Sequence, residues 1–485
     1  MSFSVSLSVS RFLPRFLPRF LLWALIVAAQ TAVAGCGRTP ALEPLRPIGS
    51  QPAIDLLPVF TQSVNNDIDI VFLIDNSGSM EQEQENLRRN FPVFTRALKS
   101  LPQGLPNVHI GVVSSDLGSG RFDTVRGCTP PGGQGRFQNA PRAGGCAGPR
   151  DAYISAVSGV QNFDGDIDQV FSCIASLGMN GCGFEHQLQA LRTALDPELM
   201  PLENRGFLRE EAVLAVILLT DEDDCSAPPN SALFDPSQTL VSDPLGPVNS
   251  YRCNEFGHLC AGQRPPRAPA TNLEDCHSAE DGRLIKVSEL VEFFKTLKAD
   301  PNDVIVAAIT GPEAPYAVTL ERQQIRGTTQ LEPKIVPSCR SANGTADPAV
   351  RIHEFVKAFG RNGTSLSICA DDFSPVMARI GEEVARRASL ECLADRVADT
   401  DLDRPGLQAH CEVHDETTGG GATLRQLIPA CAAGAPPCWR IEPSTKCATS
   451  DARMVVDRAG VAPPVGTRVR VTCETCDKPD DRRCD

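Results

Sequence analysis

Short runs of apolar residues alternate with stretches of mixed polarity from about residue 64 to residue 390. Each run is almost wholly apolar and does not alternate with polar positions, which is typical of parallel strands buried on both faces. We therefore expect a sheet of mostly parallel strands. The five runs are Ile70–Ile74, Val108–Val113, Val213–Leu219, Val304–Ile309 and Ser365–Cys369.

The stretches between the runs repeat apolar residues every three or four positions, which predicts amphipathic helices. A last helix is expected to begin at Ser374-Pro375, with the serine as its cap and the proline in its first turn. Strands that alternate with helices indicate an α/β fold with a doubly wound, mostly parallel sheet. The expected helix faces are Leu87, Phe91, Phe94 and Leu98; Phe184, Leu188, Leu191 and Leu195; Val287, Leu290, Phe294 and Leu297; Ile352, Phe355, Val356 and Phe359; and Met377, Ile380 and Val384.

Three long insertions without periodicity interrupt this pattern, at residues 115–160, 222–284 and 311–348. Loops of this length are usually functional or disordered, and the cysteines inside them suggest that disulfides hold them. Cys128 with Cys146 is a plausible local bridge, and Cys339 with Cys369 is a second candidate. Residues 391–485 are rich in cysteine and poor in long apolar runs. They predict a small β-rich, disulfide-held module, in which residues 467–472 alternate as a half-exposed strand.

The first 35 residues predict an export signal. Arg11, Arg15 and Arg19 precede an apolar core at residues 21–29, and no acidic residue occurs among them. The stretch Val33-Ala34-Gly35-Cys36 resembles a bacterial lipobox, which implies that Cys36 is the lipid attachment site. Residues 36–62 then read as a Pro-rich tether. Because Gly37 is not an acidic retention residue, we expect an outer-membrane or cell-surface location. Plain secretion is the alternative.

Cysteine content and charge agree with export. The chain has 19 Cys, so an even number remains once Cys36 is set aside, as expected for disulfides in an oxidising compartment. Removal of the three signal-peptide arginines would lower the formal net charge from −14 to −17. A charge of this sign disfavours binding to nucleic acid or to anionic lipid head groups.

Polar residues that suit a divalent cation follow two of the expected strands. Asp75, Ser77 and Ser79 follow Ile70–Ile74, and Asp221 follows Val213–Leu219. In an open α/β sheet, ligands bind outside the carboxyl ends of the strands. Hydroxyl and carboxylate oxygens are ligands for Mg²⁺, with Ca²⁺ or Mn²⁺ as alternatives. The competing interpretation is that these residues only cap helices.

With these residues in place, the chain from residue 63 to 390 resembles the von Willebrand factor type A (vWA) domain. Asp75, Ser77 and Ser79 match that family's metal-ion-dependent adhesion site (MIDAS), and Asp221 matches its second aspartate. The resemblance implies one divalent ion at the top of the sheet. It also implies that the ion keeps one position open for an acidic side chain of a protein partner.

One position departs from the family. The loop that should supply a metal-binding threonine reads Gly178–His186 and contains none. Alignment on the following helix puts Cys182 or Glu185 near the position of the family's metal-binding threonine. Cys182 is a poor ligand for Mg²⁺ and is expected in a disulfide, with Cys173 as a candidate partner. Glu185 is a hard oxygen donor that could replace the hydroxyl, although its charge would weaken the capture of an outside acid.

Two function classes follow from these observations. The first is a lipid-anchored envelope protein that binds proteins or mediates adhesion through the metal; the alternative is a structural envelope protein in which metal and disulfides only add stability. Neither a nucleophile–base pair nor a hydrolase motif is present, so we expect no enzyme activity. The acids that follow Asp221, Glu222 to Asp224, are expected to form a solvated turn, with a role around the metal as the alternative.

Overall fold

The computed structural model describes residues 59–485 apart from 66, 102–103, 129–130, 142–145, 326–327, 343, 388–391, 394, 420–421, 432–434, 445–446, 448–449, 460, 462, 465–466, 476–482 and 484–485. The expected signal peptide, Cys36 and most of the expected tether lie outside these residues. Among the described residues, no helix combines the length and apolar composition needed to cross a membrane.

A seven-stranded sheet forms the centre of the α/β part, in the order β14-β9-β6-β2-β3-β4-β5. Five strands run parallel, and β4 and β5 join one edge antiparallel. The sequence did not predict this antiparallel edge, which comes from the first insertion. The strands are β2 (Asp67–Ile74), β3 (Asn107–Ser114), β4 (Ile154–Val157), β5 (Val160–Gln161), β6 (Val213–Leu219), β9 (Val304–Thr310) and β14 (Gly363–Ser367).

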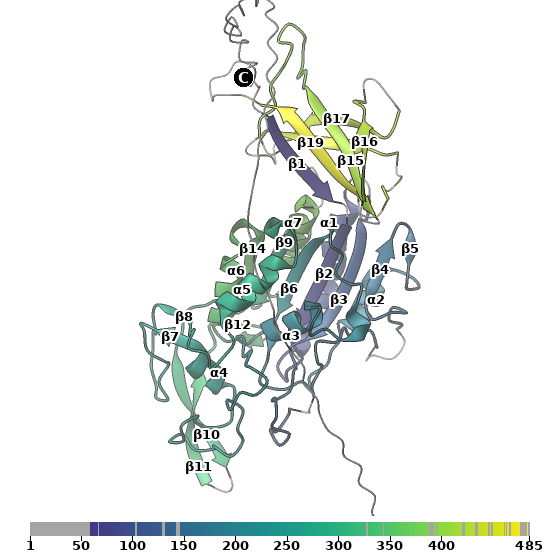
Figure 1. The fold of residues 1–485 in the computed structure, drawn as a ribbon. Coiled ribbons are helices and arrows are strands. Elements are labelled where there is room, and N and C mark those ends of the chain that lie inside the picture. Colours follow the sequence, from purple (N-terminus) through teal and green to yellow (C-terminus); the bar gives the residue numbers. More distant parts are fainter. Residues whose placement is uncertain are drawn as a thin grey trace, which may run out of the picture. The chain divides into compact units, whose positions relative to one another are not determined.

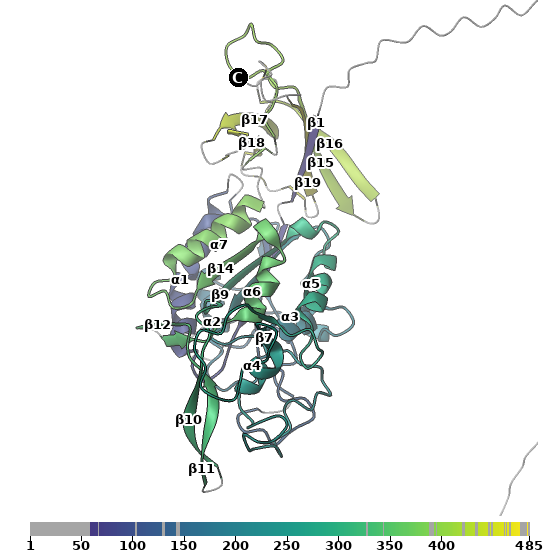
Figure 2. The same cartoon turned by 90° about the vertical axis from the view of Figure 1, so that its left-hand side faces the viewer.

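Helices cover both faces of this sheet (Figure 1, Figure 2). Alternate residues of β2 explain why: Phe72 packs among one set of helices, and Val71 and Leu73 pack among the other. A strand buried on both faces needs apolar residues at every position, which confirms the origin of the unbroken apolar runs. One face carries α1 (Glu81–Lys99), α2 (Ile167–Ile174) and α7 (Ser374–Arg387); the other carries α3 (Gln187–Leu195), α5 (Val287–Thr296) and α6 (Val350–Lys357).

Two element boundaries differ from the expectation. The third helix begins at Gln187, so Phe184 lies before it and packs in a separate cluster with Phe234. The last parallel strand is Gly363–Ser367, two residues earlier than expected. Short 3₁₀ helices occur at Leu202–Asn204, Pro301–Asp303 and Gly360–Asn362.

The other insertions also contain ordered elements. The second holds α4 (Tyr251–Gly257) and the strand pair β7 (His258–Cys260) and β8 (Cys276–Ser278). The third holds the hairpin β10 (Val318–Ile325) and β11 (Thr328–Ile335), and the pair β12 (Cys339–Ser341) and β13 (Gly344–Ala346).

Disulfides tie these insertions down, as expected, but not all with the expected partners. The Cys339–Cys369 bridge is confirmed. The Cys128–Cys146 and Cys173–Cys182 pairings are wrong, because Cys128 bonds Cys182 and Cys146 bonds Cys173. The fold brings cysteines together that are distant in sequence, and spacing alone does not encode this. The further bridges are 225–253, 260–276, 392–447, 411–473 and 431–438.

The C-terminal residues form the β-rich, cysteine-bridged part that was expected. A four-stranded sheet has the order β1-β19-β15-β16, and β17 pairs with β18. β1 lies directly before β2 in the chain and pairs antiparallel with β19, a pairing that the sequence did not suggest. The strands are β1 (Val59–Asn65), β15 (Cys411–Gly419), β16 (Ala422–Ile428), β17 (Cys438–Pro443), β18 (Ala452–Asp457) and β19 (Thr467–Glu474).

Candidate metal centre

The candidate site lies where β2 and β6 end. The chain passes from β2 to β3 on one side and later returns to place β6 on the other side of β2, so the strand order reverses between β2 and β6. Crevices at such reversals, outside the carboxyl ends of the strands, are the usual ligand sites of open α/β sheets. The Asp75 amide donates to the Leu219 carbonyl oxygen at 2.9 Å. The loops that carry Asp75 and Asp221 therefore start side by side.

Asp75 is fully buried, and several donors hold its carboxylate. Its Oδ1 accepts from the Ser77 amide at 2.8 Å and from the Ser115 hydroxyl at 3.3 Å. Its Oδ2 accepts from the Thr220 hydroxyl at 2.6 Å, and the Gln187 side-chain amide donates to that hydroxyl oxygen at 3.0 Å. With its oxygens engaged in this way, Asp75 is placed to fix the site and to contribute negative charge.

Ser77 and Ser79 form the turn between β2 and α1. Their hydroxyl oxygens lie 3.3 Å apart; Ser77 is buried and Ser79 is exposed. Neither serine caps α1, because the residue at the helix N-cap is Met80 and no side chain bonds the first turn. The capping interpretation thus does not account for the two serines. Their hydroxyls form one side of a site with a buried floor and a solvent-exposed rim.

Glu185 and Asp221 bring buried carboxylate oxygens that receive no hydrogen bond from the described residues. Asp221 is 5 % exposed and Glu185 is 1 % exposed. Among the described residues, neither forms an ion pair, and Asp221 Oδ1 and both carboxylate oxygens of Glu185 have no hydrogen-bond donor. Buried carboxylates are normally paired or bound to a cation. These oxygens therefore mark a place that suits a positive ion.

Burial, together with the neighbouring negative charges, raises the pKa values of the carboxyl groups at this site. Burial, followed by the charge of Asp75, raises the pKa of Asp221 to about 8, and the Ser79 hydroxyl partly opposes this rise. Burial, followed by the charge of Asp75, also raises the pKa of Glu185 well above its ordinary value. The Asp347 amide donates to the Asp221 carbonyl oxygen at 2.8 Å, and burial raises the pKa of the Asp347 carboxyl to about 7.

The available donors fit a hard divalent cation. Within the described part of the chain, no three His, Cys, Asp or Glu side chains converge on a point that could hold a metal ion. An ion at this edge would depend on the Ser77 and Ser79 hydroxyls together with the carboxylates of Asp221 and Glu185. All of these are oxygen donors, as Mg²⁺ and Ca²⁺ prefer. Cys182 is not available as a ligand because it is bonded to Cys128.

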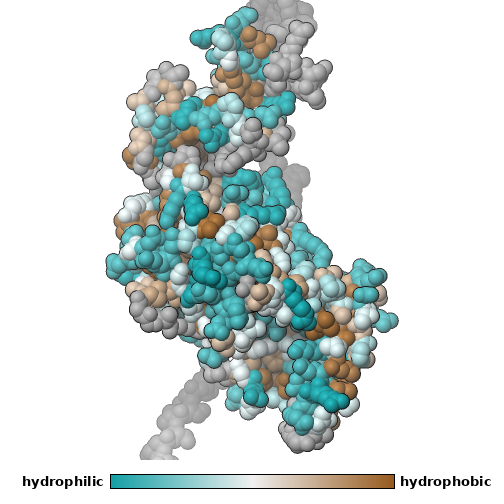
Figure 3. Space-filling model, turned by 180° about the vertical axis from the view of Figure 1, so that it is seen from behind, coloured by the Kyte–Doolittle hydropathy of each residue, from teal (hydrophilic) through white to brown (hydrophobic). Residues whose placement is uncertain are grey.

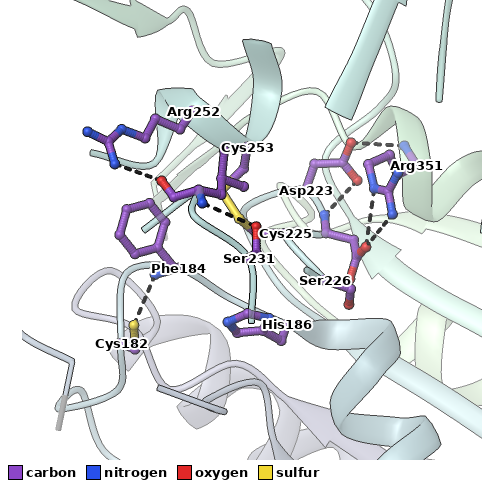
Figure 4. Close-up of a disulfide and its surroundings, with 12 residues drawn as sticks. Cys182, Phe184, His186, Asp223, Cys225, Ser226, Ser231, Arg252, Cys253 and Arg351 are labelled. Carbon is purple, nitrogen blue, oxygen red and sulfur yellow. Dashed lines mark hydrogen bonds and ion pairs between the residues drawn. A yellow bond between two sulfur atoms is a disulfide. The ribbon is translucent and has the colours of Figure 1, made fainter. Parts of the chain in front are cut away.

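The acids that follow Asp221 have a different role from the one expected. Asp223 and Asp224 are buried, so the expectation of a solvated turn is wrong for both. Asp224 pairs with Arg351 at 3.0 Å and accepts from the Leu188 amide at the start of α3. Asp223 contacts His258 at 2.7 Å and accepts from the Arg351 amide at the start of α6. Figure 4 shows the Arg351 guanidinium directed at this turn, which anchors two helices and an insertion.

Sequence reasoning missed four residues that orient the site: Ser115, Thr220, Gln187 and Gln84. Gln84 donates to the Asp75 carbonyl oxygen at 2.8 Å and to the Gly178 carbonyl oxygen at 3.0 Å, which joins the turn after β2 to the loop before Glu185. Ser115 and Thr220 could have been found from the sequence, since each directly follows a strand, as Asp75 does. The two glutamines give no such indication.

Comparisons with known proteins add little. No family model matches the chain, and no curated protein matches it. Solved structures similar to parts of it include two crystal forms of proximal thread matrix protein 1 from the mussel byssus. The identities are 11 % and 10 % with TM-scores of 0.26 and 0.24, over 68 % and 67 % of this chain. The chain spans about half the length (48 %) of the mussel protein. Likeness this weak supports no conclusion about fold or function.

Proposed function

We propose that this chain is a lipid-anchored, non-enzymatic protein of the bacterial cell envelope, whose vWA-like α/β part binds one divalent cation and uses it to bind a protein partner. Mg²⁺ is the proposed ion, with Ca²⁺ or Mn²⁺ as alternatives. The observation that carries the proposal is the meeting of the Asp75 and Asp221 loops at the reversal of strand order, with buried carboxylate oxygens that lack donors.

In this proposal each residue has a distinct task. Ser77, Ser79, Asp221 and Glu185 would hold the ion, and Asp75 would orient the turn through its hydrogen bonds to Ser77 and Thr220. The ion would supply an electrophilic centre for one more oxygen ligand. Because Ser79 lies at the exposed rim, an acidic side chain of a partner could supply that ligand.

The surface is consistent with a contact that depends on a specific ion. On the face seen in Figure 3, hydrophobic residues lie in small groups among hydrophilic ones. Large continuous apolar patches often mark protein interfaces, and the described residues on that face form none. A metal–carboxylate bond would give such a polar surface a strong and directional contact.

A structural role for the metal is the second candidate, and Glu185 favours it. A second buried carboxylate beside Asp221 would neutralise more of the ion's charge and lower its attraction for an outside acid. In that case the ion would stabilise the edge of the sheet, and the insertions or the C-terminal strands would make the contacts with partners.

One experiment separates the two candidates. The full chain is used to capture envelope proteins with Mg²⁺ and again with EDTA, alongside Ser77→Ala and the matched control Ser100→Ala at the far end of α1. Metal-dependent binding predicts that capture of an identified partner is lost in EDTA and in Ser77→Ala but is kept in the control. Capture that persists in EDTA, together with a lower melting temperature, would favour the structural role.

A further inference from the structure

The β10–β11 hairpin of the third insertion is paired over its whole length, from Val318 opposite Ile335 to Ile325 opposite Thr328. Its outer half extends away from the α/β part (Figure 1, Figure 2), and residues 321–324 of β10 are exposed. A two-stranded hairpin has two outer edges, and every second residue turns its backbone amide and carbonyl groups toward such an edge. The two edges of this hairpin differ.

The direction of the backbone groups of β10 follows from one contact at its start. The Val318 amide donates to the Ala270 carbonyl oxygen at 2.8 Å, and the Ala270 amide donates to the Val318 carbonyl oxygen at 3.0 Å. Both Val318 groups therefore point away from β11. Because such positions alternate along an antiparallel strand, the amide and carbonyl groups of Leu320, Arg322 and Gln324 point the same way. In the described part of the chain these groups have no hydrogen-bond partner.

The contact with Ala270 also shows that this edge accepts a third strand. The Leu273 amide donates to the Tyr316 carbonyl oxygen at 2.9 Å, so the segment from Ala270 to Leu273 lies antiparallel beside the start of β10. Among the described residues, the pairing ends at Val318. The outer edge of β10 beyond Val318 is therefore open, and the direction of an added strand is already set.

The outer edge of β11 is blocked. Pro333 lies opposite one of the outward-pointing residues of β10, so its own nitrogen points outward, and proline has no amide hydrogen to donate. The Gln330 side-chain amide donates to the Thr239 carbonyl oxygen at 2.8 Å, and the Asn249 side-chain amide donates to the Glu332 carboxylate at 2.8 Å. The second insertion thus contacts this strand. A new strand fits beside β10 and not beside β11.

The side chains beside the open edge indicate which kind of strand fits it. Arg322 lies opposite Leu331, which is 50 % exposed, and Leu320 lies on the same face of the hairpin. Among the described residues Arg322 forms no ion pair, whereas its neighbour Glu321 is paired with Lys334 at 3.2 Å. An acidic residue opposite Arg322 and an apolar residue opposite Leu320 would complement this face.

A second copy of this chain fits the same edge less well. Antiparallel pairing of two β10 strands about the middle of the open edge would place Glu321 opposite Glu321, or Arg322 opposite Arg322. Like charges directly opposite each other destabilise a sheet. A segment of another polypeptide has no such constraint.

We propose that β10 binds an extended segment of a partner polypeptide as a third strand, antiparallel to β10, with an acidic residue facing Arg322 and an apolar residue, two positions later, facing Leu320. Backbone hydrogen bonds to Leu320, Arg322 and Gln324 supply the affinity, and the two side chains supply the specificity. This surface goes beyond the proposed function and does not depend on it, because none of these residues belongs to the candidate metal centre.

The test is calorimetric titration of the full disulfide-bonded chain with the end-blocked peptide Val-Thr-Glu-Thr-Val-Thr, with EDTA present so that the peptide's glutamate has no metal ion to bind. In the proposed register the valine and glutamate amides face β10, and the threonine amides face away. N-methylation of the valine and glutamate amides should lower the affinity at least tenfold. N-methylation of the three threonine amides should change it less than twofold.

Two proline variants at directly opposite positions give a matched comparison within the protein. Gln324→Pro removes an amide from the open edge of β10, and Thr329→Pro removes one from the blocked edge of β11. Both variants lose the hydrogen bond between the Gln324 and Thr329 side chains, so the loss of that bond is common to the two. Gln324→Pro should lower the affinity for the peptide at least fivefold, and Thr329→Pro should change it less than twofold.

Exchange of charge tests the acidic residue. Arg322→Glu should reverse the preference of the chain, so that the peptide with lysine in place of glutamate binds more tightly than the parent peptide. Arg340→Glu makes the same change at an exposed arginine of β12 and should leave the preference as it is in the wild-type chain.

No binding of the parent peptide at millimolar concentration, or an equal loss of affinity in the two methylated peptides, would overturn the proposal. The peptide comparison needs no variant, so a folding defect cannot obscure it. Sedimentation of the chain alone tests the other occupant: we expect a monomer, and a dimer that Gln324→Pro dissociates would assign the edge to a second copy instead. Because the titrations contain EDTA, failure here would not bear on the proposed metal site.

Discussion

The buried acids at the two ends of strand β2 differ in whether cationic side chains pair with them. At its start, Asp69 is fully buried and receives the Arg209 guanidinium at 2.8 Å and the Arg209 amide at 2.7 Å, with Lys298 at 3.6 Å. Directly beyond its other end, Asp75 is just as buried but receives only hydroxyl and amide donors. Its neighbours Asp221 and Glu185 receive no cation from the described part of the chain.

This difference shows at which end of β2 the chain's own cations neutralise the buried acids. Buried carboxylates are tolerated when cations pair with them. Asp69 is neutralised in this way at the amino edge, which is the edge of the sheet at the amino end of β2. The carboxyl edge, beyond the carboxyl end of β2, has the same burial without the cations. Burial, followed by the charge of Asp75, raises the pKa values of Asp221 and Glu185 there. An external cation would make the two edges alike.

The largest expected effect concerns the amino edge. Arg209→Met would leave Asp69 buried with an incomplete set of partners, and breaking such a pair costs about 3–5 kcal/mol of unfolding free energy. Urea denaturation measures this loss, which should be the same in Mg²⁺ and in EDTA. Arg150→Met, which removes an exposed pair with Asp164, is the control and should change stability by less than about 1 kcal/mol. A loss in Arg209→Met as small as in the control would contradict the comparison.

The next effect concerns the residues that orient the carboxyl edge. Thr220→Val keeps the shape of the side chain but removes the hydroxyl that donates to Asp75. Changes to such supporting residues typically lower metal affinity by about 10–100-fold, and titration with Mg²⁺ measures this. Thr296→Val, on an exposed threonine at the end of α5, should leave the affinity unchanged. Equal affinity in all three proteins would show that Thr220 does not support a metal site.

A smaller effect is expected from pH. The pKa of Asp221 is raised to about 8 and that of Asp347 to about 7, so in the absence of metal the folded chain holds protons that the unfolded chain releases near pH 4. The contribution of these two carboxyl groups to stability in EDTA is therefore full below about pH 4 and is lost as the pH rises to about 8, so stability should fall between pH 5 and pH 8. Thermal melts should show a decrease of several degrees, which saturating Mg²⁺ reduces.

The variant Asp221→Asn separates this effect from general alkaline destabilisation. Without the carboxylate, the melting temperature in EDTA should depend less on pH, and Mg²⁺ should no longer raise it at pH 8. A melting temperature that rises from pH 5 to pH 8 in EDTA, or one that falls equally in the variant, would mean that these carboxyls do not repel one another in the folded chain.

The parallel strands could be predicted because burial on both faces leaves an unbroken apolar run in the sequence. The helices could be predicted because their apolar residues recur every three or four positions. Asp75 and Asp221 could be found for a related reason, since Asp75 directly follows such an unbroken run and Asp221 follows another after Thr220. The pairing of Asp224 with Arg351 could not, because the two residues are 127 positions apart and nothing local links them. The burial of Glu185 and the Cys128–Cys182 bridge likewise depend on how the insertions fold back.

The central claim is that a divalent cation completes the carboxyl edge of the sheet. Electron paramagnetic resonance of the full chain titrated with Mn²⁺ tests it most directly, because the sharp spectrum of free Mn²⁺ is lost on binding. We predict one tightly bound Mn²⁺ per chain, displaced by excess Mg²⁺ and absent from the double variant Ser77→Ala, Asp221→Asn. Free Mn²⁺ throughout the titration, or the same binding in the double variant, would contradict the claim.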